Sequence, residues 1–154
     1  MLHCLKETVT QIMREKNITQ QDLADIIGVT RSAVNLILNR DNIRISKIKT
    51  ISNALGYELM ITYISRYEDR QDWIMLSDTK IDFFKSLDEL LQSRKLTHAD
   101  LGSMLEIPAS NVKIMYEHPD VSVLRTKELA NVLGYNLSIR MISRKNPNDI
   151  RKVV

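Results

Sequence analysis

NALGYELMITYISR, residues 53–66, returns 78 positions later as NVLGYNLSIRMISR, residues 131–144, with nine identities in fourteen positions. The match needs no gap and extends outward in both copies. Residues 5–66 and 83–144 share fifteen identities in 62 positions, where roughly four are expected from typical residue frequencies. The chain is therefore predicted to contain a duplicated unit.

Both copies predict the same order of helices. Apolar residues at helical spacing in 2–13 and 83–91 predict a first helix in each copy. Thr19 followed by Asp22 has the spacing of a capping box at the start of a second helix, and the pair recurs 78 residues later. A third helix is expected to begin near Thr30, or near the proline at the matching position.

A fourth helix is expected from Ser46 to Gly56, with its counterpart ending at Gly134. After each glycine the apolar residues alternate, which predicts strands at 57–65 and 135–143. A lone strand cannot satisfy its backbone hydrogen bonds. The predicted fold class is mainly α: two tandem domains of about four helices, each followed by one strand, with the strands paired into a two-stranded antiparallel sheet.

The expected domains are 1–66 and 80–144, joined by a linker at 67–79 and followed by a tail at 145–154. The two strands pair either within one chain, making it an internal pseudo-dimer, or between two chains in a homodimer. The apolar run 73–76 in the linker is expected to pack onto a domain surface.

Residues 19–24, TQQDLA, and 28–34, GVTRSAV, have the spacing of a helix-turn-helix. An alanine sits where the two helices approach most closely, and a glycine sits in the turn, where positive φ is often needed. These runs resemble the Xre family, the lambda-repressor-like or Cro-type DNA-binding proteins. The resemblance covers about 1–56 and, more loosely, 80–134.

The resemblance implies double-stranded DNA as partner, with the third helix in the major groove. Arginine and asparagine suit this role because they pair bidentately with guanine and adenine. The implied base-reading residues are Thr30, Arg31, Ser32, Asn35 and Asn39. Residues expected at phosphates are Gln20, Gln21, Arg40, Asn42, Arg44 and Lys47. The second copy offers Ser110, Asn111 and Lys113.

The second copy departs from the pattern at three positions. Glu106 replaces Gly28, so its turn is expected to be altered or strained. Glu117 and Asp120 replace asparagines at matching positions and would repel phosphate. Contact between the second copy and DNA is therefore left open, against a structural or protein-binding role.

Composition excludes several classes of protein. The net charge is +3, compatible with a polyanionic partner. A single cysteine, Cys4, permits no intrachain disulfide and no cysteine metal cage. No secretory signal, and no apolar run near the roughly 18 residues of a membrane span, is seen. No catalytic motif appears. We expect a cytoplasmic protein that is not an enzyme, with no cofactor and no metal.

The sequence thus predicts a sequence-specific transcriptional regulator, a repressor of phage or mobile-element type acting at a pseudo-palindromic operator. One alternative is the antitoxin of a toxin–antitoxin pair, which also holds a protein partner. This alternative is weakened because only 145–154 follow the repeat. The other alternative is a protein-interaction module whose helix-turn-helix copies no longer bind DNA.

Overall fold

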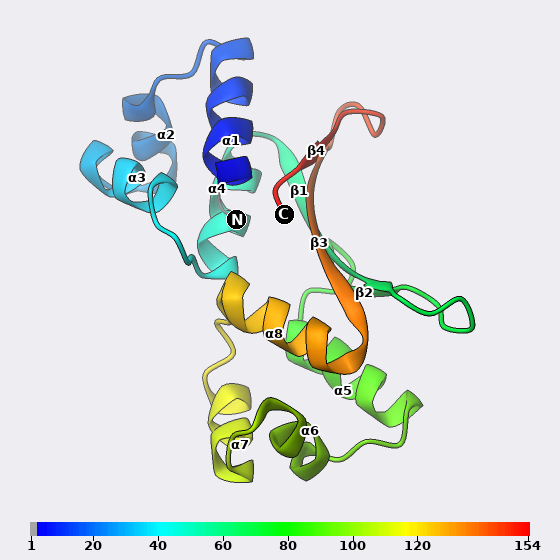
Figure 1. The fold of residues 1–154 in the computed structure, drawn as a ribbon. Helices are drawn as coiled ribbons and strands as arrows, with labels where there is room; N and C mark the ends of the chain where they lie inside the picture. Colours follow the sequence, from blue (N-terminus) through cyan, green and yellow to red (C-terminus); the bar gives the residue numbers. More distant parts are fainter. Residues whose placement is uncertain (1–2) are drawn as a thin grey trace.

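The computed structural model describes residues 3–154, with side chains from Leu5 onward, so the Cys4 side chain lies outside the described set. Two runs of four helices are each followed by strands of one shared sheet, and about half of the chain is helical (Figure 1). The first run comprises α1 His3–Glu15, α2 Gln20–Ile27, α3 Arg31–Leu38 and α4 Ile45–Ala54, followed by β1 Tyr57–Ser65 and β2 Trp73–Leu76. The second comprises α5 Phe83–Ser93, α6 His98–Leu105, α7 Ala109–Glu117 and α8 Val123–Leu133, followed by β3 Tyr135–Ser143 and β4 Ile150–Lys152.

Both predicted capping boxes are present. The Thr19 hydroxyl accepts from the Asp22 N–H at 3.0 Å, and the Asp22 carboxylate accepts from the Thr19 N–H at 2.9 Å. Thr97 and Asp100 repeat the arrangement at 3.1 and 2.8 Å. The backbone N–H of each threonine, and then its side chain, lowers the pKa of the aspartate that caps with it. These contacts begin α2 and α6 at matching positions.

The turn after each of these helices has a left-handed residue. Gly28 has φ +75° and ψ +34°, and Glu106 has φ +58° and ψ +40°. The glutamate therefore does not alter the path of the turn; it adopts a conformation that favours glycine. The predicted start of the fourth helix is wrong by one residue: α4 begins at Ile45, and the Ile45 N–H, which has no partner inside the helix, donates to the Val121 carbonyl at 2.9 Å.

The sheet is antiparallel and has the strand order β2-β1-β3-β4. The predicted pairing of 57–65 with 135–143 is present within the chain, in unbroken register from Tyr57–Ser143 to Ser65–Tyr135. The expectation of only two strands is wrong. β2 lies in the segment predicted as a linker and β4 in the segment predicted as a tail, and they cover the outer edges of β1 and β3.

The sheet is symmetric under the 78-residue shift. Ile61 pairs with Ile139 in the β1–β3 ladder, and these residues are equivalent positions of the repeat. Arg44 and Ser122, which are also equivalent, form an isolated antiparallel bridge where α4 and α8 begin. A residue that pairs antiparallel with its own equivalent lies on a local two-fold axis. Each pair therefore lies on a local pseudo-two-fold axis.

The outer strands obey the same symmetry. Thr62 pairs with Ile74, and Arg140 pairs with Lys152, the residues 78 positions further on. β2 and β4 are thus equivalent strands, although 67–76 and 145–154 have no identical residue at any matching position. The structural repeat is longer than the repeat detected in the sequence.

The two helical runs interlock through the outer strands, because α1 packs against β4 and α5 against β2. The Thr8 hydroxyl donates to the Lys152 carbonyl at 2.8 Å, and Arg151 pairs with Glu15 at 2.7 Å. Each first helix therefore rests on the last strand of the other repeat. We conclude that strands of both repeats form one sheet, and that the first helix of each repeat covers the outer strand of the other repeat.

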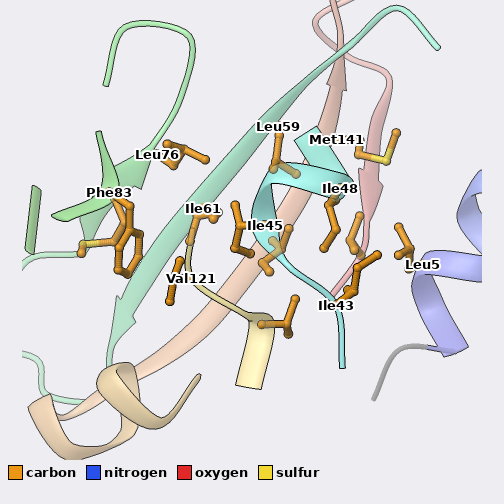
Figure 2. Packing of buried hydrophobic residues seen from close by; sticks show 14 of the residues in the cluster. Leu5, Ile43, Ile45, Ile48, Leu59, Ile61, Leu76, Phe83, Val121 and Met141 are labelled. Atoms are coloured by element: carbon orange, nitrogen blue, oxygen red, sulfur yellow. The ribbon is translucent and has the colours of Figure 1, made fainter. Parts of the chain in front are cut away.

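Buried side chains from both repeats form one cluster, which Figure 2 shows from close by. Leu5 enters it from α1, Ile48 from α4 and Ile61 from β1. Phe83 and Met141 enter it from the second repeat. Among residues 3–154, no helix is long and apolar enough to cross a membrane.

Candidate nucleic-acid interface

The helix-turn-helix of the first repeat is built by α2, the Gly28 turn and α3. Ala24 is fully buried at the contact between the helices, and Val34 and Ile37 face inward from α3. The Thr30 hydroxyl accepts from the Ala33 N–H at 3.1 Å and so caps α3. Thr30, predicted as a base-reading residue, therefore already has a local structural role.

The outer face near the start of α3 carries polar residues. Arg31, Ser32 and Asn35 are all exposed. Within residues 5–154, the side chains of Arg31 and Ser32 make no hydrogen bond or ion pair. These two predicted reading residues are thus available to a ligand, on a helix whose other face is fixed by the core.

Asn39 closes the other end of α3. Its amide donates to the Asn35 carbonyl at 2.7 Å and to the Asn35 side-chain oxygen at 3.1 Å, and its own oxygen accepts from Lys6 at 2.8 Å. The contact with Lys6 ties α3 to α1. Asn39 is therefore engaged within the chain rather than free like Arg31.

Two predicted phosphate-binding residues lie at the junction of the repeats. The Asn42 side-chain oxygen accepts from the Leu124 N–H at 3.0 Å, in the first turn of α8, and Arg44 donates to the Asp120 carbonyl. The sequence did not predict these contacts, because each joins positions 76 to 82 residues apart. Both side chains remain exposed, so their predicted contact with phosphate stays a prediction.

The other predicted phosphate-binding residues lie around α2 and α3. Gln21 donates to Asp25 at 2.9 Å, one turn further along α2. Gln20 is half-buried, whereas Arg40 and Lys47 are exposed. Among the side chains that the structure describes, neither Arg40 nor Lys47 takes part in an ion pair. These two cations follow α3 and are free to meet an anion.

The second repeat presents a different outer face. Ser110, Asn111 and Lys113 are exposed on α7, but Lys113 lies 3.9 Å from Glu117. An exposed pair at this distance holds the lysine only weakly. α7 therefore offers one cation and two small polar groups where α3 offers an arginine.

Sequence reasoning missed a polar cluster inside the second repeat. The Tyr116 hydroxyl donates to Asp88 at 2.6 Å, and the His98 ring lies 2.9 Å from the same carboxylate oxygen and stacks on the Tyr116 ring. Burial, and then the bond to Asp88, raises the pKa of Tyr116. No spacing signals this cluster, because its members come from three helices. It fixes α7 against α5 and α6.

Figure 1 shows α3 and α7 on the side of the molecule away from the sheet, with α4 and α8 between them and the strands. Both helices follow a capped helix and a left-handed turn, and they occupy equivalent positions of the 78-residue repeat. The arrangement presents two helices of equivalent origin and unequal chemistry on one side.

Residues 9–60 match the helix-turn-helix family model HTH_3, a range that runs from α1 into β1. The first repeat therefore contains an Xre-like helix-turn-helix domain. This class consists of DNA-binding regulators and is not typically enzymatic. No curated protein and no solved structure matches the chain.

Proposed function

We propose that the chain is a sequence-specific DNA-binding transcriptional regulator that reads the major groove with the start of α3. The observation that carries this proposal is the pair Arg31 and Ser32, exposed and without side-chain partners in the described structure, in the domain that matches the helix-turn-helix family. Arg31 suits guanine, and Asn35 suits adenine.

We further propose that two tandem lambda-repressor-like units act as a pseudo-dimer in one chain. The backbone pairs Ile61–Ile139 and Arg44–Ser122 support this, since each joins equivalent positions. In this proposal the helix-turn-helix of each repeat is one DNA-binding head. Two heads related by a two-fold axis fit two DNA half-sites in opposite orientation, about one helical turn apart. Covalent linkage raises the effective concentration of the second head without new contacts.

The two half-sites should differ in strength. α3 brings Arg31, whereas α7 brings Lys113 with Glu117 beside it. A lysine binds phosphate as a point charge but lacks the arginine fork. The second head therefore adds affinity through the DNA backbone more than base discrimination, and the operator is only approximately palindromic.

The proposed action is repression: a protein that occupies the operator blocks polymerase. The resemblance to lambda-repressor-like proteins supports a repressor of the kind carried by phages and mobile elements. The antitoxin alternative is less well supported, because residues 150–152 form β4 and pack on α1 rather than trailing as a segment that holds a toxin.

The test is selection of bound DNA from a random pool, followed by salt-dependent gel shifts on the selected site. Arg31→Ala should weaken binding by about 5- to 150-fold and relax specificity at one base pair. Lys113→Ala should weaken all sequences alike and lower the salt slope by about one.

The matched control is Lys145→Ala, which removes an exposed cation from the β3–β4 turn. It should leave base preference unchanged. Absence of binding by the wild-type chain at low salt, where phosphate contacts are strongest, would refute the proposal and favour a protein-interaction module.

A further inference from the structure

A cavity of about 380 Å³ opens where the two repeats meet, between the ends of α3 and α7. Its wall contains Arg40 with its equivalent His118, and Arg44 with its equivalent Ser122. Arg44 and Ser122 form a backbone bridge between equivalent positions, so the cavity borders the local pseudo-two-fold axis of that bridge. Arg125 of α8 completes its polar wall.

Positive charge dominates the cavity. Three arginines line it, and the one lining carboxylate, Asp120, accepts a hydrogen bond from the Ser46 hydroxyl at 2.9 Å. Arg125 keeps part of its guanidinium free, since only one of its nitrogens bonds to Glu128, at 2.9 Å. Arg40 has no ion-pair partner among the described side chains. The cavity wall therefore contains guanidinium N–H donors from both repeats that have no acceptor among the described side chains.

We propose that this cavity binds a phosphate group, held jointly by Arg40 of the first repeat and Arg125 of the second. A guanidinium presents donors in a planar fork that matches two phosphate oxygens, so two of them can enclose one group. The size of the cavity leaves room for more than a single phosphate. Neither repeat can form the site alone, because Arg40 comes from the first repeat and Arg125, which is also paired with Glu128, comes from the second.

The phosphate has two candidate sources with the same chemistry. One is the DNA backbone at the centre of the operator, and this source rests on the proposed function, in which the pseudo-two-fold axis passes through that centre. The other is a free phosphorylated small molecule, which would occupy the same arginines and so compete with DNA. The experiment separates the two sources.

The first arm uses inorganic pyrophosphate without DNA, titrated into the full chain in a calorimeter at low salt. The wild-type chain should bind it, and Arg40→Gln and Arg125→Gln should each weaken binding by about tenfold or more. Lys145→Gln is the matched control, since it removes one exposed cation outside the cavity, and should have no effect. Equal urea midpoints for all variants would show that the fold is intact.

The second arm measures DNA affinity against salt for the same variants. If pyrophosphate does not bind, but Arg40→Gln and Arg125→Gln weaken all DNA sequences alike and each lowers the salt slope by about 0.9, the source is the DNA backbone. Binding of pyrophosphate that survives Arg31→Ala and is lost in Arg40→Gln identifies a free anion.

The inference is overturned if neither arm distinguishes Arg40→Gln and Arg125→Gln from the Lys145→Gln control. The first arm needs no DNA, so the two proposals can fail separately. A chain that binds pyrophosphate through Arg40 but binds no DNA refutes the proposed function and keeps the anion site.

Discussion

Replacing Glu106 by glycine should stabilise the protein, and replacing Gly28 should destabilise it. Both residues occupy the left-handed position after the second helix of their repeat, with φ of +58° and +75°. Glycine adopts this region without steric cost, whereas a residue with a Cβ does not. The first repeat thus has the residue that the turn favours, and the second has a strained substitute.

The magnitude follows from the surroundings of each position. A Cβ added at Gly28 would meet no atom within 4 Å, so Gly28→Ala tests backbone conformation without a clash. The left-handed conformation costs about 1–2 kcal/mol for a residue with a Cβ. The lower entropy of the unfolded alanine chain returns about 0.4–1 kcal/mol. We expect a net loss of roughly 1 kcal/mol for Gly28→Ala and a similar gain for Glu106→Gly.

Urea unfolding of the full chain is the appropriate assay, because a change in midpoint at constant slope reports stability. For a chain of this size, 1 kcal/mol corresponds to about 2–4 °C in melting temperature. Glu106→Ala is the control, since it removes the carboxylate and keeps the strained Cβ. The reasoning is refuted if Glu106→Gly is no more stable than Glu106→Ala.

Three further predictions concern the shared sheet. Tyr63 is fully buried and donates to the Thr126 carbonyl of α8 at 2.8 Å, so Tyr63→Phe should lower the free energy of unfolding by about 1–2 kcal/mol; an unchanged urea midpoint would contradict this. The hydrogen bond from Arg151, and then that from Tyr57, lowers the pKa of Asp149. The ionised Asp149 carboxylate therefore stabilises the fold fully above its ordinary pKa near 3.8, and this stabilisation is lost as the pH falls through the pKa of the folded state. Unfolding curves measured at pH 6 and pH 3 should accordingly differ less in Asp149→Asn than in wild type. Pairing of β1 and β3 within one chain predicts a particle of 17.8 kDa by light scattering, and a stable species of twice that mass would favour pairing between chains.

Local features of the fold could be predicted from the sequence because their causes are local. The capping box of Thr19 and Asp22 depends on residues three apart, and the alternation in 57–65 depends on residues two apart. The helix-turn-helix followed from spacing in the same way, and its match to the family confirms that part. The availability of Arg31 also follows from local position, because it lies on the outer face of a short helix.

The two outer strands could not be predicted from the repeat. β2 and β4 are equivalent in the structure, yet their sequences share no residue at matching positions. Their common property is burial: Met75 and its equivalent Val153 are both completely buried. A shared need to bury an apolar side chain constrains volume and polarity rather than identity, so it leaves no trace in a count of identical residues.

The roles of Asn42 and Arg44 could not be predicted for a different reason. A polar side chain after a reading helix suits a phosphate, and it suits a carbonyl or an N–H of the other repeat equally well. The contacts that Asn42 and Arg44 make with the second repeat depend on the bridge between Arg44 and Ser122, which brings the two loops together. Only the relative position of the two repeats contains that information.

The distribution of identities between the repeats follows from the pseudo-two-fold axis. β1 and β3 are identical at five of nine positions, whereas α3 and α7 are identical at two of eight, one of them the buried pair Val34 and Val112. β1 and β3 pack against each other along their whole length, so a change in either strand must still fit the other. The outer faces of α3 and α7 have no such partner and are free to differ. A covalently linked pair can therefore keep a symmetric junction while its two heads come to suit unequal half-sites, which a dimer of identical chains cannot do.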